Sequence, residues 1–163
     1  MKKQEVFFVN KMIYIQTNLG KIGIIEDGVG ITNLFFKNQI VPQNIIEEKT
    51  PLLLKAEYQI RQYLKGERKI FDLSLSLKGT DFQIKDWNAL LDIPYGETRT
   101  YKDIAIKIGN PKSCRAVGLA NHKNPISIII PCHRVIGTNG KLTGYGGGIQ
   151  IKKYLLEIEK KYK

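Results

Sequence analysis

Start and stop signals for short helices recur along this chain and divide it into small elements. Thr50 followed by Pro51 is typical of a helix N-cap and first helical residue, because proline lacks the N–H that would be unpaired there. This helix is predicted to run to about Leu64, before Gly66 stops it. The apolar runs between such signals are far shorter than the roughly 20 residues of a membrane span. The chain is therefore predicted to pack short elements together, with no transmembrane helix.

The second half carries similar signals. An amphipathic helix is predicted over residues 81–91, and the following turn leads to Thr100. Thr100 and Asp103 resemble a capping box, in which a hydroxyl and an acidic side chain satisfy free backbone donors at a helix start. This second helix is predicted to end at Gly109, a common C-terminal stop.

A further short helix is predicted over 112–121, with Asn110 as its N-cap and Pro111 as its first residue. Two short helices joined by a glycine-containing turn are typical of a DNA-binding helix-turn-helix, although an ordinary helical hairpin has the same pattern. Gly118 costs about 1 kcal/mol relative to alanine inside a helix, so we expect a close approach there. The approaching surface is either another protein element or a DNA groove.

The first ninety residues have strand-like patterns around one helix. Alternating residues over 12–17, 22–26 and 31–37 predict a hairpin followed by a third strand. The polar stretch 42–49 is predicted to be a loop, and 70–77 a strand or an extended connector. No recognisable chemical motif occurs in these segments, so this half is predicted to be a small α/β scaffold.

Positive charge is concentrated in the second half of the chain, whose overall net charge is +11. Residues 1–90 carry 13 basic and 10 acidic residues, whereas 91–163 carry 13 basic and 5 acidic residues, giving net charges of +3 and +8. Such a field attracts polyanions such as DNA, although RNA-binding, membrane-surface and simply soluble basic proteins share it. The first eleven residues lack the long apolar region of a secretory signal, so we expect a cytoplasmic protein without membrane attachment.

The chain has two cysteines, Cys114 and Cys132, and a disulfide is not expected in a reducing cytosol. Together with His122 and His133 they lack the paired spacings of a zinc site. The apolar run 126–130 is predicted to be a buried strand, and Cys132 near its end has an imidazole beside it. This arrangement is a candidate nucleophile, because a base or cation must generate the thiolate. A buried, inert cysteine is the commoner alternative.

The C-terminal helix, predicted over 149–162, places a carboxylate on its apolar stripe. Ile151, Leu155 and Glu159 follow one another at spacings of four residues. A buried carboxylate requires a partner, and His133 is suitable because a carboxylate can hold its tautomer and support its positive charge. The alternative is a solvated helix end, since only four residues follow Glu159.

The motifs of the second half form a recognisable set. They are Ile93-Pro94-Tyr95-Gly96, Tyr101, Arg115-Ala116-Val117-Gly118, Asn124-Pro125, Pro131-Cys132-His133-Arg134-Val135, Gly144-Tyr145 and Leu155-Leu156-Glu157-Ile158-Glu159. This set resembles the O6-alkylguanine-DNA alkyltransferase family, also called methylated-DNA–protein-cysteine methyltransferases. The resemblance implies an α/β ribonuclease-H-like domain over 1–79. It also implies a mostly α, winged-helix-like (helix-turn-helix) domain over 80–163 that holds the active site.

The resemblance further implies DNA repair by direct reversal of damage. The alkyl group of O6-alkylguanine in double-stranded DNA would pass to Cys132 in a single turnover, after the base is flipped out of the stack. His133 is implied as a base acting through water, oriented by Glu159. Asn124 is implied to brace the active-site turn, and Tyr101 to rotate the phosphate and help neutralise the leaving guanine. Activity on O4-methylthymine is left open.

The same resemblance implies two groups of binding residues. The implied DNA contacts are Arg115, Ala116, Gly118, Tyr101, Lys112 and Lys123. The implied alkylguanine pocket consists of Tyr145, Gly146, Val135 and Pro131. Arg115 would fill the space of the flipped nucleotide, and the small residues would let their helix approach the minor groove. No cofactor and no metal is implied, and we expect a monomer.

Two other classes of function fit parts of the pattern. A non-catalytic binder of alkylated DNA is the first alternative, but such relatives lack the cysteine that is present here as Cys132. A cysteine hydrolase or a plain helix-turn-helix regulator is the second. A hydrolase would have no need of Arg115, and a regulator would have no need of Cys132, His133 and Glu159 together.

Overall fold

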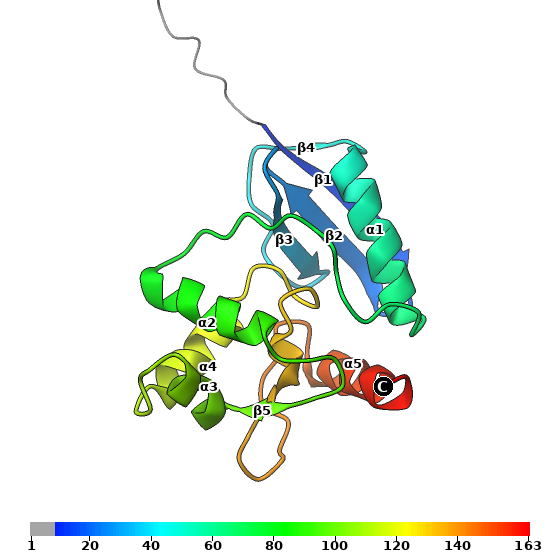
Figure 1. The fold of residues 1–163 in the computed structure, drawn as a ribbon. Helices are drawn as coiled ribbons and strands as arrows, with labels where there is room; N and C mark the ends of the chain where they lie inside the picture. The colour runs from blue at the N-terminus through cyan, green and yellow to red at the C-terminus, as the bar shows by residue number, and fades with distance from the viewer. Residues whose placement is uncertain (1–8) are drawn as a thin grey trace, which may run out of the picture.

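A four-stranded, mostly antiparallel sheet forms the first half of the structure, a computed structural model that describes residues 9–163. β1 (Asn10–Thr17) pairs with β2 (Gly20–Glu26), and β2 pairs with β3 (Ile31–Phe36). The predicted hairpin and third strand are therefore present. α1 (Pro51–Leu64) lies along one face of this sheet (Figure 1).

The segment predicted as a loop over 42–49 contains a fourth strand, so that prediction is wrong in part. β4 (Ile45–Glu47) pairs in parallel with β1, from Asn10 opposite Ile45 to Met12 opposite Glu47. The sheet order is β3-β2-β1-β4. A three-residue edge strand is too short to show alternation in the sequence, and its pairing partner lies more than thirty residues away, so no local pattern reveals it.

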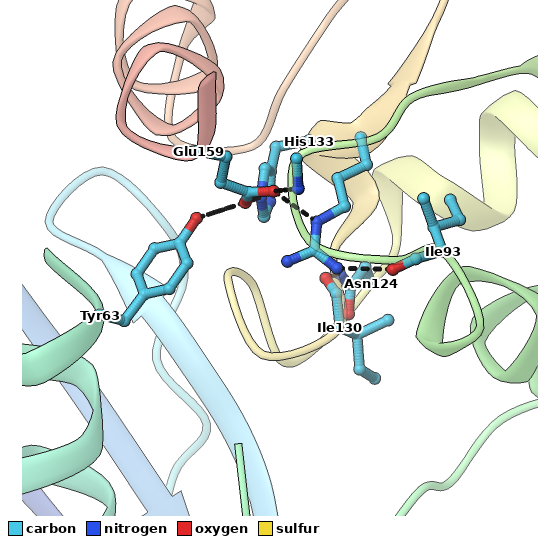
Figure 2. A network of polar contacts seen from close by, with 8 residues as sticks. Tyr63, Ile93, Asn124, Ile130, His133 and Glu159 are labelled. Atoms are coloured by element: carbon cyan, nitrogen blue, oxygen red, sulfur yellow. Dashed lines mark hydrogen bonds and ion pairs between the residues drawn. The ribbon is translucent and has the colours of Figure 1, made fainter. Parts of the chain in front are cut away.

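α1 begins and ends as the sequence predicts. Thr50 Oγ1 accepts a hydrogen bond from Leu53 N at 3.1 Å, and Pro51 is the first helical residue. One face of the helix is buried, and the last residue on this face is Tyr63, whose side chain is 0 % exposed. This buried face directs Tyr63 toward the second half of the molecule (Figure 2).

The second half is helical. α2 (Asp81–Leu91), α3 (Tyr101–Lys107) and α4 (Cys114–His122) pack on one another (Figure 1). α5 (Ile149–Lys161) packs against η1 (Cys132–Arg134), a single turn of 3₁₀-helix. The short parallel strands β5 (Arg99–Thr100) and β6 (Val135–Ile136) connect the start of α3 with the end of η1.

α4 begins later than predicted, because Asn110 serves the preceding helix. Gly109 has φ +82° and donates to Ile106 O, while Asn110 N donates to Ala105 O. These two bonds form a Schellman motif that closes α3. Ser113 is the N-cap of α4, so Asn110, the predicted N-cap, and Pro111, the predicted first residue, lie in the turn.

The apolar run 126–130 is a buried turn and not the predicted strand. Only Ile126 forms a β-bridge, with Leu34 of β3, after which Ile130 N donates back to Ile126 O at 3.0 Å. Ile128, 0 % exposed, has φ +72°, a conformation that a β-branched residue rarely adopts. The run is apolar because it fills the core, not because it belongs to a sheet.

The two halves share one hydrophobic core and are joined along β3. Ile31 N donates to Ser74 O at 2.8 Å, and Leu34 N donates to Pro125 O at 2.9 Å. The connector containing Ser74 therefore lies on the edge of β3, and 70–77 is an extended connector with one isolated bridge at Leu75. Buried residues from both halves, including Ile24 and Leu90, belong to the same cluster.

The helices within residues 9–163 are all too short or too polar to cross a membrane. The prediction that the first eleven residues lack a secretory signal concerns mainly residues 1–8, which lie outside the described part of the chain.

Candidate active site

Cys132 is the first residue of η1, and its side chain is nearly buried, with 8 % exposed. Burial raises the pKa of the Cys132 thiol to about 11, although the Asn124 amide and the Lys152 ammonium both lower it. The thiol is therefore protonated at neutral pH. A nucleophilic reaction at Sγ requires a nearby base to take this proton.

His133, the residue that follows Cys132, forms a buried pair with Glu159 (Figure 2). His133 Nε2 lies 2.5 Å from Glu159 Oε2, and the side chains are 0 % and 1 % exposed. The predicted contact is present, and Glu159 is not a solvated helix end. The apolar stripe of α5 carries the carboxylate inward, where it meets the residue that follows Cys132.

The electrostatics of this pair define its protonation. Burial alone would raise the pKa of Glu159, but the hydrogen bond from His133, together with the charge and hydrogen bond of Arg134, lowers it to about 2. Burial lowers the pKa of His133 despite the opposing effect of Glu159, so the imidazole is neutral at pH 7. Because Glu159 is ionised, the proton of the neutral imidazole lies on Nε2. Nδ1 is buried, has no hydrogen-bond partner within residues 9–163 and is the free basic nitrogen.

Sequence reasoning missed three further groups that hold Glu159. Arg134 Nε donates to Glu159 Oε1 at 2.7 Å, and Gly96 N donates to the same oxygen at 3.0 Å. Tyr63 Oη donates to Glu159 Oε2 at 2.6 Å and lies 3.3 Å from His133 Nε2 (Figure 2). Arg134 and Gly96 stand in motifs of the sequence, whereas Tyr63 looks like an ordinary buried residue of an amphipathic helix.

Asn124 shapes the turn before Cys132. Its Nδ2 donates to Ile130 O at 2.8 Å, and its Oδ1 accepts from Ile126 N at 3.0 Å. One buried amide thus ties both ends of the turn that contains Ile128 with its positive φ. Such a conformation costs on the order of 1–3 kcal/mol and persists only where surrounding bonds hold it. Asn124 provides two of these bonds.

Lys152 is a second charged residue that sequence reasoning missed. It is 1 % exposed, and its Nζ donates to Val135 O at 2.7 Å and to Thr143 O at 3.2 Å. Burial lowers its pKa, whereas the negative charge of a Cys132 thiolate would raise it. Lys152 lies three residues before Leu155 on α5, and this helical spacing on a buried stripe is the signal that could have identified it.

The other predicted site residues lie in two places: at the outer face of α4 and around η1. Tyr101, Arg115 and Gly118 line a cavity of about 420 Å³ on α4, together with Cys114, His122, Thr143 and Gly144. Tyr101 Oη is hydrogen-bonded to Thr143 Oγ1, so Tyr101 is not part of the network around His133. Cys114 is half-buried and packs against the core.

The outer face of α4 is open. Lys112, Arg115, Ala116 and Lys123 are exposed. A Cβ added at Gly118 would come no closer than 3.8 Å to the Tyr101 ring, which is ordinary van der Waals contact. Of the two alternatives for Gly118, a close approach by another protein element is therefore not found among residues 9–163, and the protein's own packing does not require glycine there.

The predicted pocket residues surround η1. Tyr145 is 8 % exposed and its ring packs edge-on against His133, at 6.5 Å between centroids. Gly146 is half-buried, and a Cβ there would lie 2.7 Å from Nε2 of Gln39, a flexible side chain from the first half. Pro131 and Val135 are buried at the two ends of η1, and Pro131 also lines a separate cavity of about 530 Å³ with Arg134.

The sequence matches two family descriptions along nearly its whole length. Residues 10–77 match "6-O-methylguanine DNA methyltransferase, ribonuclease-like domain", and residues 81–161 match "6-O-methylguanine DNA methyltransferase, DNA binding domain". The chain belongs to the 6-O-methylguanine DNA methyltransferase family. The expected fold class is confirmed, since this family combines a ribonuclease-like domain bearing the sheet with a helical DNA-binding domain.

Other members of the 6-O-methylguanine DNA methyltransferase family match closely. Curated proteins named methylated-DNA–protein-cysteine methyltransferase from Methanosarcina barkeri and Bacillus subtilis are 50 % and 49 % identical. The alignments cover 89 % of this chain in both cases, and 94 % and 92 % of those proteins. The crystal structure of Mycobacterium tuberculosis OGT in complex with DNA has a TM-score of 0.89 at 48 % identity. It covers 93 % of this chain and 94 % of that one.

Proposed function

We propose that this chain repairs DNA by transferring the alkyl group of O6-alkylguanine to its own Cys132. Direct reversal of alkylation damage by transfer to a protein cysteine is the activity of this family, and this chain is a methylated-DNA–protein-cysteine methyltransferase. The observation that carries the assignment to Cys132 is its buried thiol in η1, directly before His133, whose imidazole is held by Glu159. That arrangement supplies both a nucleophile and a base held in one tautomer.

The reaction proceeds as an in-line displacement. Because an alkylated guanine is not reachable within the stack, the nucleotide is flipped into the protein. The thiol proton moves through water to Nδ1 of His133, and Glu159 stabilises the imidazolium. Sγ then forms a bond to the alkyl carbon as the carbon–O6 bond breaks, and the leaving guanine takes up a proton with the help of Tyr101. The product is a thioether on Cys132, which nothing in the site reverses.

The chain binds DNA, and we propose that α4 is the element that enters the minor groove. Its open face, Arg115 on that face, the lysines just outside its two ends and the unfilled space at Gly118 support this role. Arg115 fills the gap left by the flipped nucleotide, while Lys112 and Lys123 contact phosphates. Small residues such as Ala116 allow the backbone to approach the duplex.

The alkylguanine pocket is proposed to lie between η1 and the glycine-rich loop. Tyr145 and the backbone of Gly146 line it, and Pro131 fixes the approach to Cys132. The Val135 carbonyl accepts from the guanine amino group through its second lone pair, because Lys152 occupies the first. This pocket would select double-stranded DNA that contains O6-alkylguanine.

Three further properties belong to the proposal. The boundary between domains lies at residues 79 and 80, which is supported by the extended connector before α2. The protein is proposed to act as a monomer. It works in the cytoplasm and needs no cofactor, because the thiol, the base and the carboxylate complete the displacement.

Intact-mass measurement after mixing with O6-methylguanine DNA tests the proposal. We expect one methyl group per protein molecule, located on Cys132, and no further product with excess DNA. Cys132→Ser should abolish the transfer and keep DNA binding, whereas the matched Cys114→Ser variant should react fully. Repeated turnover, or methylation of Cys132→Ser, would overturn the proposal. Tight binding without methylation would instead favour a lesion binder.

A further inference from the structure

The hydroxyl of Tyr63 joins the His133–Glu159 pair from the other half of the molecule. Tyr63 lies at the end of α1, in the ribonuclease-like domain, and is 0 % exposed. Its Oη donates to Glu159 Oε2 at 2.6 Å, and this is the same oxygen that lies 2.5 Å from His133 Nε2 (Figure 2). A residue outside the DNA-binding domain therefore contacts the atom that holds the base.

Packing explains the ring of Tyr63 but not its hydroxyl. The ring lies 5.4 Å from the Phe71 ring, 6.2 Å from the Tyr95 ring and 6.4 Å from the His133 ring, measured between centroids. Phenylalanine would fill this space equally well without a polar atom to satisfy. Burying a hydroxyl is unfavourable unless it finds a partner, and here the partner is the Glu159 carboxylate.

We propose that Tyr63 is a positioning residue for alkyl transfer, and the proposal rests on the function assigned above. Its hydroxyl fixes the Glu159 carboxylate so that Oε2 keeps the Nε2–H of His133 and leaves Nδ1 free as the base. The phenol of Tyr63 has one proton, which it donates to Glu159 Oε2 in the shorter of its two contacts. It therefore donates no hydrogen bond to Nε2 of His133. The ribonuclease-like domain thereby contributes directly to the orientation of the base.

The charges around the pair are consistent with this role. Burial and the Glu159 charge raise the pKa of Tyr63, so the phenol stays protonated and acts only as a donor. The other ionisable groups that face the pair or the neighbouring thiol come from several elements: Asp86, Tyr95, Cys132, Arg134, Tyr145 and Lys152. Of these, only Arg134 forms a hydrogen bond to Glu159 within residues 9–163, and it does so at Oε1. Tyr63 is the group that shares Oε2 with His133.

Tyr63→Phe tests the proposal, with Tyr95→Phe as the matched control. The Tyr95 hydroxyl belongs to the same aromatic cluster but has no hydrogen-bond partner within residues 9–163. The single-turnover rate of methyl transfer would be measured from pH 5 to pH 9. We expect Tyr63→Phe to slow transfer by roughly 10- to 100-fold, since small displacements of a catalytic group have effects of this size. Tyr95→Phe should stay within about twofold of the wild type.

The pH profile separates positioning from packing. Without the Tyr63 proton, Oε2 becomes a stronger acceptor for His133, so the imidazolium is favoured and the pKa of His133 rises. The acidic limb of the rate profile should therefore move to higher pH in Tyr63→Phe only. The proposal would be overturned if Tyr63→Phe had the transfer rate and the acidic limb of the wild type. It would also be overturned if Tyr63→Phe and Tyr95→Phe changed both quantities equally.

A measurement on the unmodified protein guards against misfolding of the variant. The chain has two histidines, so the imidazole ¹⁵N spectrum contains one buried site, His133, and one exposed site, His122. We expect His133 to be protonated at Nε2 and free at Nδ1 at pH 7. The opposite tautomer would overturn the proposal without any activity assay. If the wild-type protein is not methylated at all, the proposed function fails; if it is methylated and Tyr63→Phe behaves like the wild type, only the role of Tyr63 fails.

Discussion

Arg134 donates through Nε to Glu159 Oε1 at 2.7 Å, while His133, the preceding residue, contacts Oε2 of the same carboxylate. One buried side chain of α5 therefore holds two consecutive residues of η1, directly after Cys132. The guanidinium is anchored further, because its other end donates to Ile93 O at 2.6 Å. The carboxylate thus has two tasks: it sets the state of the base and it fixes the backbone that carries the nucleophile.

Replacing Glu159 should affect both tasks. Glu159→Gln is expected to slow methyl transfer by up to about 10⁴-fold, the loss seen when the orienting carboxylate of a triad is replaced by its amide. It should also raise the pKa of Cys132, because the imidazolium that accompanies a thiolate loses its support. Single-turnover rates and thiol titration measure these effects. The exposed Glu157→Gln on the same helix is the control. Unchanged thiol titration in Glu159→Gln would contradict the assigned role.

The same variant makes a prediction about stability. Arg134 would stay buried without its carboxylate, and breaking a buried pair in this way costs about 3–5 kcal/mol. Because the pKa of Glu159 is lowered from 4.5 to about 2, this contribution is present above pH 4.5 and is lost as the pH falls toward 2. The difference in free energy of unfolding between wild type and Glu159→Gln should therefore shrink over that range. Denaturant titrations at pH 7 and pH 3 provide the comparison, and a difference that is constant with pH would contradict it.

Arg115 should stabilise the DNA in which the alkylated nucleotide is flipped out of the duplex. Arg115→Ala is expected to slow repair of methylated duplex DNA by roughly 10- to 100-fold, because unstacking a base costs a few kcal/mol. Reaction with free O6-alkylguanine needs no flipping and should change little. The ratio of the two rates is the measurement, and Lys102→Ala, which alters an exposed residue of α3, is the control. Equal losses on both substrates would place Arg115 in the active-site fold and not in the duplex.

Lys112 and Lys123 should behave as phosphate contacts. For each, replacement by alanine is expected to reduce the slope of log K against log salt by about 0.9. The change should be equal for methylated and unmodified duplexes, since phosphates carry no information about the lesion. Binding titrations at several salt concentrations test this, with Lys21→Ala in β2 as the control. A loss confined to methylated DNA would show that these residues recognise the base.

The burial of Asp86 should make the protein less stable as the pH rises from acidic values toward 7. This residue of α2 is 0 % exposed, and its carboxyl group lies against the side-chain amide of Asn121, with 2.6 Å between the nearest atoms. Burial raises the pKa of Asp86 from 3.8 to about 7, so its contribution to stability is greatest at acidic pH and is lost as the pH rises toward 7.

Asp86→Asn removes this titratable group. Its free energy of unfolding should therefore rise relative to that of the wild type, by on the order of 1–3 kcal/mol as the pH is raised from 5 to 8. Thermal unfolding at the two pH values measures the change. Asp81→Asn, at an exposed position of the same helix, is the control for loss of a negative charge. A constant difference between Asp86→Asn and wild type would show that Asp86 is ionised throughout.

The sequence alone determined the elements whose signals are local. Thr50 with Pro51 fixed the start of α1, and the Thr100–Asp103 capping box fixed the start of α3, because caps act between residues three apart. The motif around Cys132 and the spacing that leads to Glu159 also indicated the chemistry, since nucleophile and base are neighbours in the chain and the carboxylate follows a helical repeat.

Tertiary structure decided what depends on distant partners. β4 exists only because the edge of β1 accepts it, and the run around Ile128 is a turn because Asn124 ties its ends. The contact between Tyr63 and Glu159 joins residues 96 positions apart, and nothing in the sequence near either residue encodes it. A local pattern records which face of a helix is buried but not what it is buried against. The shared core of the two domains alone brings the α1 hydroxyl to the base.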